Sequence, residues 1–469
     1  MTLPKLPLQE TLQNLPPEWP DDPGPDIRAA IERRGEKTVV IDDDPMGTQT
    51  VANVSVLADW SVESIVDELK NDLRATFILA NTRSMPVDEA VSVVSEAGRN
   101  VRAAAEQIGK KVIVVSRSDS TLRGHYPAEV DAMAEALGQK SAVHIITPFF
   151  LEGGRYTIGD IHYVAEGDHL IPAGQTEFAR DNAFGYRSSN IREWVEEKTG
   201  GRIPASQVAT VSIEDIRVGG PDRVTELLLD LGEAKACFPN AASTRDTEVF
   251  ALGVIRAEEQ GVRFTYRSAA AFLKARGGLE SRPLLTASDF GAKGDAGGLT
   301  IVGSHVPRST SQLEHLLEQP DVSSVEINAS QLVDDAQRSK EIDRVAQIVN
   351  TLLKRGEDVA MYTSRVLITG NSADANLEVG HRVSDGVVEI VRRIDVRPRY
   401  FIAKGGITAS DIATQALGFK RAMCIGQILP GVPVWEFGSE SRYPGLKYVA
   451  FPGNTGGPEA LSEAVAKLR

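Results

Sequence analysis

Apolar and polar positions alternate in two distinct patterns along most of the chain. Short runs rich in Val and Ile are separated by longer segments in which apolar residues recur every three or four positions. The first pattern is typical of buried strands and the second of amphipathic helices. Buried strands that alternate with helices indicate a parallel sheet covered on both faces. In the first half we expect strands at 37–43, 75–82, 111–118 and 142–150, and helices at 86–109 and 128–138.

Two segments of the first half interrupt this alternation. Residues 154–164 alternate like a strand, and we expect a hairpin there that lies over the site. Residues 176–190 have the composition of a loop. The α/β alternation resumes from about residue 208 and continues to 277.

A Gly-rich polar stretch at 276–298 is the best candidate for a linker, because 469 residues are too many for one ordinary core. The alternation restarts after it without a detectable repeat of the first half. We therefore predict an α/β fold of two unlike domains with mainly parallel sheets and an active site in the cleft between them. The predicted parts are a proline-rich arm at 1–36, a first domain at 37–277, a linker at 278–298 and a second domain at 299–469. The prolines suggest that the arm is extended over the surface or loose.

Polar side chains follow four of the predicted strands of the first domain. These segments are Asp42–Asp44, Asn81–Ser84, Ser118–Ser120 and Thr147–Pro148. Ligands of parallel sheets bind at the carboxyl ends of the strands, so we expect one rim built from four segments.

The three consecutive carboxylates Asp42, Asp43 and Asp44 repel one another and therefore need an explanation. They would either accept hydrogen bonds from substrate hydroxyls, one of them serving as a general base, or hold Mg²⁺. A capping turn with solvated acids is the alternative.

The stretch SRSDSTLRGH is rich in groups that bind anions and hydroxyls. The guanidinium groups of Arg117, Arg123 and, from the next strand end, Arg83 suit a carboxylate, whereas Asp119 and Ser120 suit hydroxyls. The structural alternative is an internal Arg–Asp network that closes the turn.

Charge and composition limit the possible partners. The chain has 51 Lys and Arg against 65 Asp and Glu, a net charge of −14, which argues against nonspecific nucleic-acid or membrane binding. No membrane span or secretory signal is visible, so we expect a cytoplasmic protein. The two cysteines, Cys237 and Cys424, lie in apolar surroundings and are expected to be buried and reduced. A homo-oligomer is compatible with this sequence.

Three glycine turns follow strands of the second domain. They contain Gly303 with Ser304, then Gly405 with Gly406, and finally Gly453. Glycine lets the backbone approach a ligand, and a following helix offers free N–H groups to phosphate. Neither a Walker P-loop nor a dinucleotide fingerprint is present, so a nucleotide would use another architecture.

Lys404 precedes the double glycine and has two open interpretations. It is either a phosphate contact or a solvated lysine at the end of a strand.

Seven motifs in this order resemble the four-carbon acid sugar kinase family: IDDDPMGTQT, NTRS, SRSDSTLRGH, TPFFLEGGRYTIGDIHYV, KGGITASD, GQILPGVPVW and FPGNTGG. Members phosphorylate the terminal hydroxyl of threonate, erythronate or 3-oxo-tetronate with ATP. The resemblance implies that the first domain binds the sugar acid and the second the nucleotide. Many relatives begin the acidic turn with Ala-Asp-Asp, where this chain has a third aspartate, Asp42.

The resemblance, taken together with the strand-end residues Ser118 and Lys404 noted above, assigns residues. The catalytic candidates are Asp43, Asp44 and Asp119, and the acid would be bound by Arg83, Ser118, Asp119, Ser120, Thr121 and Arg123. The nucleotide would be bound by Ser304, Lys404, Gly405, Gly406, Ile407, Thr408 and Gly453. The expected cofactors are ATP and Mg²⁺, the metal being held mainly by the ATP phosphates, with no protein ligand assigned.

Two other functions compete with a kinase. One is a sensor that binds a sugar acid and a nucleotide without catalysis. The other is an α/β oxidoreductase, which the missing dinucleotide fingerprint disfavours.

Overall fold

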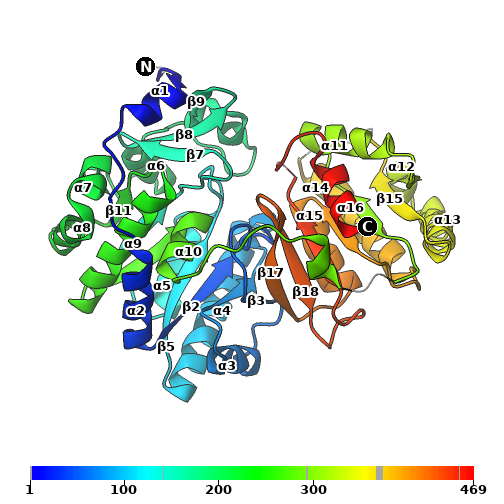
Figure 1. The fold of residues 1–469 in the computed structure, drawn as a ribbon, viewed down its shortest axis with the longest axis horizontal. Helices are drawn as coiled ribbons and strands as arrows, with labels where there is room; N and C mark the ends of the chain where they lie inside the picture. The colour runs from blue at the N-terminus through cyan, green and yellow to red at the C-terminus, as the bar shows by residue number, and fades with distance from the viewer. Residues whose placement is uncertain (1–2, 141, 292–293, 366–372, 454) are drawn as a thin grey trace. The chain divides into compact units, whose positions relative to one another are not determined.

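The computed structural model describes all residues except 1–2, 141, 292–293, 366–372 and 454, so residues 292 and 293 of the predicted linker lie outside it. The chain divides into two compact units. The first unit comprises Met1–Gly47 and Asp59–Glu280, and the second comprises Thr48–Ala58 and Ser281–Arg469. Both are α/β units with mainly parallel strands, as predicted (Figure 1). No helix among the described residues is long and apolar enough to cross a membrane.

The first unit is built on a parallel sheet. In sheet order its strands are β10 (Val208–Val211), β11 (Ala236–Pro239), β6 (Val143–Thr147), β12 (Phe264–Ser268), β5 (Lys111–Arg117), β2 (Glu36–Asp42) and β4 (Ala75–Leu79). Every pair of neighbours that we can describe is parallel. All residues of β2 are buried, in agreement with its continuous apolar run.

Helices connect these parallel strands, as crossover connections must. They are α3 (Val62–Lys70), α4 (Val87–Ile108), α5 (Ala128–Ala136), α6 (Ile191–Lys198), α7 (Ile213–Arg217), α8 (Gly220–Leu229), α9 (Thr244–Glu259) and α10 (Ala270–Arg276). A short 3₁₀ helix, Thr82–Ser84, follows β4. The predicted strands and helices of this half are thus confirmed to within a few residues.

The segment predicted to form a hairpin does so. Strands β7 (Arg155–Ile158), β8 (Ile161–Glu166) and β9 (His169–Pro172) form an antiparallel sheet that β1 (Leu6–Pro7) completes. Most of the following stretch, 176–190, lacks regular structure apart from a 3₁₀ turn at Glu177–Arg180.

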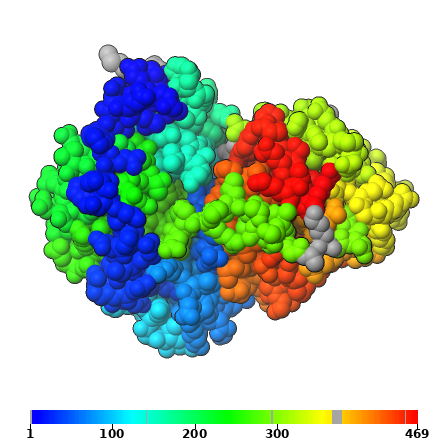
Figure 2. Space-filling model, viewed as in Figure 1, coloured from blue at the N-terminus to red at the C-terminus, as the bar shows by residue number. Residues whose placement is uncertain are grey.

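The N-terminal arm is more structured than its prolines suggest. It contains α1 (Leu8–Gln13) and α2 (Gly24–Arg34), and it runs along the surface of the first unit in blue (Figure 2). Helix α2 buries Ile27, Ala30 and Ile31, whose spacing of three to four residues places them on one face. The expectation of an extended or loose arm is therefore wrong for these residues, because this short apolar face packs against α9 and α10.

The second unit combines parallel and antiparallel strands. In sheet order these are β3 (Val54–Leu57), β17 (Arg421–Leu429), β18 (Val432–Phe437), β19 (Lys447–Phe451), β16 (Phe401–Lys404), β13 (Leu299–Val302), β15 (Asp358–Thr363) and β14 (Val322–Ile327). The strands from β19 to β14 are parallel, whereas β3, β17 and β18 are antiparallel. The helices are α11 (Pro307–Leu317), α12 (Ala329–Val333), α13 (Asp335–Lys354), α14 (Ala373–Arg392), α15 (Gly406–Asp411) and α16 (Ala460–Leu468).

Eleven residues of the first half belong to the second unit, a feature that the predicted boundaries 37–277 and 299–469 do not include. In Thr48–Ala58, strand β3 pairs with β17, with Val56 opposite Ala422. The Trp435 indole donates a hydrogen bond to the Thr48 hydroxyl at 3.0 Å. The apolar alternation of this short strand does not reveal its partner, because pairing between distant strands leaves no local signal.

Candidate functional site

The acidic turn lies at the carboxyl end of β2, between two parallel neighbours. Asp42 is in register with Leu79 of β4 and with Arg117 of β5. The segments after β2, β4 and β5 therefore meet at one edge of the sheet, as predicted. The fourth predicted segment, Thr147–Pro148 after β6, is separated from them by β12.

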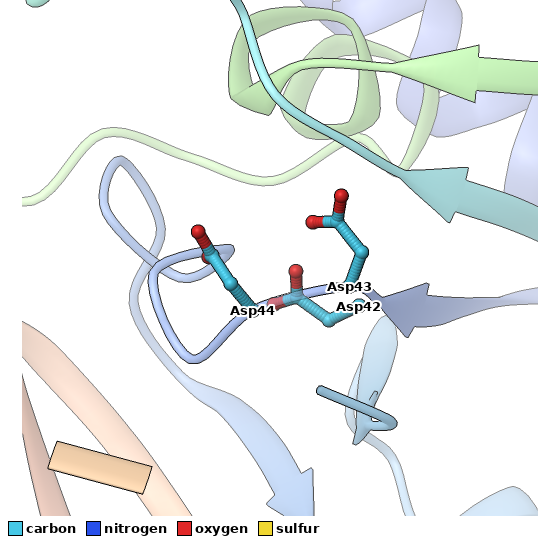
Figure 3. A group of neighbouring side chains, drawn as sticks. All are labelled: Asp42, Asp43 and Asp44. Atoms are coloured by element: carbon cyan, nitrogen blue, oxygen red, sulfur yellow. The ribbon is translucent and has the colours of Figure 1, made fainter. Parts of the chain in front are cut away.

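Three carboxylates project from this turn (Figure 3). Asp42 and Asp43 are buried, and only 18% of the Asp44 side chain is exposed. One oxygen of each lies within 4.8 Å of the others. Gly47 is required here, because a Cβ at this position would lie 1.7 Å from an Asp42 carboxylate oxygen. The alternative of solvated acids is therefore wrong.

Two arginines form ion pairs with the three carboxylates. Arg83 donates from Nε to Asp43 at 3.0 Å, and its Nη1 lies 2.6 Å from Asp44. Arg117 Nη1 lies 2.6 Å from Asp44 and 3.4 Å from Asp42. The internal Arg–Asp network that we named as an alternative is therefore present, and it stabilises the repelling acids.

The carboxylates at the two ends of the turn differ in ionisation. Burial raises the pKa of Asp42 well above its ordinary value, against the attraction of Arg117 and with the repulsion of Asp44 and Asp43. Burial also acts on Asp44, but Arg83 and Arg117 outweigh it and lower its pKa. Asp44 is therefore the carboxylate that stays ionised and keeps partial access to solvent.

The DSTLRG segment after β5 extends this network. The Ser118 hydroxyl donates to Asp43 at 3.1 Å, and Arg123 Nε donates to Asp119 at 2.8 Å. Thr121 also donates to Asp119. Although burial opposes ionisation, Arg123 and Arg83 hold the pKa of Asp119 far below its usual range. The structure thus connects the predicted residues Arg83, Ser118, Asp119, Thr121 and Arg123 with the acidic turn, and Ser120 lies between two of them in the sequence.

Two charged residues near this cluster were not among the predicted site residues. Glu129, on α5, accepts a hydrogen bond from Thr82, and burial, with repulsion from Asp43, raises its pKa to about 7. Arg267, near the end of β12, is fully buried. Arg267 had a signal, since a charge inside the buried run FTYRS is unusual, whereas Glu129 lies in an ordinary amphipathic helix.

The acidic turn fits a protein-held Mg²⁺ poorly. Hard cations need carboxylate oxygens that are ionised and available. Here Asp43 and Asp44 already contact the guanidinium groups of Arg83 and Arg117, so their oxygens are not available to a cation. We therefore derive no step from a metal bound to these aspartates.

The three glycine turns of the second unit also come together. They follow β13, β16 and β19, which are parallel neighbours. A Cβ on Gly303 would lie 2.3 Å from the Thr408 hydroxyl, and a Cβ on Gly405, where φ is +114°, would lie 3.0 Å from Ser304. A Cβ on Gly453 would lie 3.4 Å from the Ser304 hydroxyl. Backbone and hydroxyl groups of all three turns therefore meet at one edge, as phosphate binding requires.

Lys404 is not the solvated lysine of our alternative. Its side chain is fully buried, donates a hydrogen bond to the Pro452 carbonyl and lies 4.4 Å from the centre of the Phe451 ring. Burial, with Arg308 nearby, lowers its pKa to about 7. Lys404 thus connects the second glycine turn to the third.

Ile407 is the exposed member of this cluster. It follows Gly406 at the start of α15, and 59% of it is exposed. Val306, beside Gly453, is also exposed, at 45%. Two apolar side chains therefore flank the polar turns, an arrangement that suits the flat face of a base.

Comparison with known proteins agrees with the division of the chain into two unlike domains. Residues 38–276 match the model of a sugar-binding N-terminal domain, and residues 299–461 match that of a nucleotide-binding C-terminal domain. A D-erythronate kinase of Heliobacterium modesticaldum is 26% identical over 76% of this chain and 79% of its own length. A D-threonate kinase of Salmonella typhimurium is 26% identical over 84% and 89%. A 3-oxo-tetronate kinase of Cupriavidus necator is 25% identical over 90% and 92%.

Solved structures support the same fold. A Haemophilus influenzae protein superposes with a TM-score of 0.62 at 18% identity, over 92% of this chain and all of its own. A Salmonella typhimurium protein superposes with a TM-score of 0.67 at 17% identity, over 91% and 98%. These likenesses concern the fold, whereas the two matching domain models and the kinases above show that the chain belongs to the four-carbon acid sugar kinase family and is a sugar-acid kinase.

Proposed function

We propose that the protein transfers the γ-phosphoryl group of ATP to the terminal hydroxyl of a four-carbon sugar acid such as threonate, erythronate or 3-oxo-tetronate. The observation that carries the proposal is the presence, in one chain, of a rim of carboxylates and guanidinium groups and a separate rim of glycine turns. The named activities of the relatives support the same acid class.

Arg83 and Arg123 are assigned to the carboxylate of the acid. A guanidinium group carries five N–H donors, more than the contacts of Arg83 to Asp43 and Asp44 require. An incoming carboxylate would share these donors and would fix which end of the acid faces the nucleotide. Ser118, Ser120 and Thr121 would contact the hydroxyl groups along its chain.

Asp44 is assigned to the reacting hydroxyl, with Asp43 and Asp119 completing the acidic surroundings. The transition state of phosphoryl transfer is loose, so the nucleophile needs orientation more than early deprotonation. An ionised carboxylate of low pKa suits this role, since it accepts the hydrogen bond and takes the proton late. The proton then passes to solvent, and ADP and the phosphate ester leave.

The nucleotide is assigned to Ser304, Gly405–Thr408 and Gly453. Lys404 would hold two of these turns together through its hydrogen bond to the Pro452 carbonyl. Backbone N–H groups would surround the phosphates. We assign Mg²⁺ to the phosphates of ATP, where it would neutralise the charge of the transferring group. The side chains of Ile407 and Val306 would contact the base.

A panel of C4 to C6 sugar acids tests this proposal. Release of ADP is followed with each acid in the presence of ATP and Mg²⁺, and without acid as the control. We expect release with at least one four-carbon acid at a kcat of about 1–100 s⁻¹. ADP release with six-carbon acids alone would overturn the acid class, and no acid-dependent release at all would overturn the proposal.

A further inference from the structure

The DSTLRG loop has a backbone conformation that its sequence does not favour. Leu122 has a φ of +70° and Gly124 a φ of +108°. A branched, non-glycine residue in this left-handed region is an outlier that persists only where its surroundings enforce it. Leu122 is fully buried among aromatic side chains, including Tyr126, Tyr186 and Trp194. The loop is therefore held by contacts outside itself.

Three side chains from three different segments donate hydrogen bonds to carbonyl groups of this loop. His162 Nε2 lies 2.7 Å from the Ser120 carbonyl, and the Tyr186 hydroxyl donates to the Thr121 carbonyl at 2.6 Å. Arg267 Nη2 donates to the Arg123 carbonyl at 2.8 Å. His162 is in β8, Tyr186 precedes α6, and Arg267 is in β12. We call these three side chains the carbonyl clamp.

Two members of the carbonyl clamp, His162 and Arg267, have further contacts that fix them. His162 Nδ1 lies 3.0 Å from the Thr157 hydroxyl, and because a carbonyl only accepts, Nε2 carries the proton. Burial lowers the pKa of His162 to about 4, so the ring is neutral near pH 7. The guanidinium group of Arg267 lies 5.1 Å from the Trp194 ring centre. The donors are thus buried and directed before any ligand arrives.

We propose that His162, Tyr186 and Arg267 are positioning residues that hold the loop Asp119–Gly124 in the conformation that binds the sugar acid. The inference rests on the proposed function, because that function assigns Asp119 and Arg123 to the substrate. The carbonyl clamp acts on the backbone, and its members do not contact the reacting atoms. Without the carbonyl clamp the loop leaves the left-handed conformation. Binding of the acid must then also order the loop, which makes its binding free energy less favourable.

Steady-state kinetics of Tyr186→Phe test the proposal. The substitution removes only the hydroxyl and leaves the ring in its cluster. We expect the KM for the acid to rise by about 5- to 10-fold, the loss of one buried hydrogen bond. The kcat at saturating acid and the KM for ATP are expected to stay within about twofold of wild type. Tyr163→Phe, in β8 but in a different apolar cluster, is the matched control and keeps the wild-type KM.

A rescue pair separates donation from packing at position 162. His162→Ala removes the donor, whereas His162→Gln returns an N–H near the place of Nε2. We expect the KM for the acid to rise with alanine and to fall back at least partly with glutamine. An equal rise with both residues would show that the ring only fills space, which overturns the assignment.

Hydrogen exchange of the loop supplies a measurement that needs no substrate. In the peptide that contains 119–124, Tyr186→Phe should exchange about 5-fold faster than wild type or Tyr163→Phe. Unchanged exchange overturns the carbonyl clamp even if the kinase activity is confirmed. Faster exchange in an enzyme that phosphorylates no sugar acid would instead refute the proposed function and leave the clamp as a structural device.

Discussion

At the carboxyl ends of β2, β4 and β5 the first unit gathers charged side chains, whereas at the carboxyl ends of β13, β16 and β19 the second unit gathers glycines and hydroxyls. The first rim is stabilised by its own ion pairs, such as Arg83 with Asp43. The second rim exposes backbone, and its one deeply buried lysine, Lys404, is bound to a carbonyl group. A small acid with several hydroxyls needs directed side chains, while phosphate groups need close backbone N–H donors.

The largest effect is expected at Asp44. Replacing Asp44 by Asn removes the ionised carboxylate that faces both Arg83 and Arg117, and with it the acceptor for the reacting hydroxyl. We expect kcat to fall by about 10²- to 10⁴-fold, while the Kd of the nucleotide stays within about twofold. A steady-state assay of ADP release measures kcat, and isothermal titration calorimetry measures the Kd of the nucleotide.

Asp42→Asn is the matched comparison within the same turn. Burial raises the pKa of Asp42 and no reacting group is assigned to it, so a neutral amide there should lower kcat far less than Asp44→Asn does. Equal losses of kcat in the two variants would contradict the different roles assigned to Asp42 and Asp44.

A smaller effect, confined to the acid, is expected at Arg83. Arg83→Ala removes donors assigned to the substrate carboxylate, so the KM for the acid should rise by about 10- to 100-fold, as for loss of a charged hydrogen bond. The KM for ATP should stay near the wild-type value. A rise in the KM for ATP alone would contradict the assignment of Arg83 to the acid.

The reverse pattern is expected at Gly303. In Gly303→Ala a Cβ would lie 2.3 Å from the Thr408 hydroxyl and would displace the start of α15. We expect the KM for ATP to rise by about 5- to 50-fold, typical of a local overpacking cost, with the KM for the acid unchanged. Gly380→Ala, at an open position on α14, serves as the control and should match wild type in both constants.

The buried lysine should give stability a pH dependence that the Lys404→Met variant lacks. The pKa of Lys404 is about 7 in the folded protein and near 10.5 in the unfolded chain, so between these values only the unfolded state holds the proton. Stability of wild type relative to Lys404→Met should therefore rise with pH, by about 2 kcal/mol between pH 7 and 9. Urea unfolding at both pH values measures the difference, and a pH-independent difference would contradict the low pKa.

The smallest expected effect is the slow labelling of one buried thiol in each unit. Cys237 and Cys424 are free and buried, as predicted, and burial raises their pKa values to about 12 and about 11. Both should react with a thiol reagent only on unfolding, so their separate rates report the opening of each unit. Rapid labelling of either thiol in the folded protein would contradict its burial.

The local patterns of the chain predicted the strands and helices of the first half that we gave bounds for, and the sheet edge where the charged side chains gather. Periodicity is a local property, so β2 and α4 were found to within about a residue. The pairing of Val56 with Ala422 and the burial of Lys404 depend on residues far away in the chain, and no local pattern encodes them. The third aspartate, Asp42, was visible in the sequence, but its raised pKa follows from burial and from its neighbours.

In the proposed reaction the charged rim holds the carboxylate end of the acid, so that its far hydroxyl is phosphorylated. The most direct test is ³¹P–¹H correlation NMR of the product formed from ATP and a four-carbon sugar acid that the enzyme accepts. We predict a phosphate ester whose phosphorus couples to the protons on the carbon farthest from the carboxylate. Coupling to protons nearer the carboxylate, or an acyl phosphate that couples to none, would contradict this account.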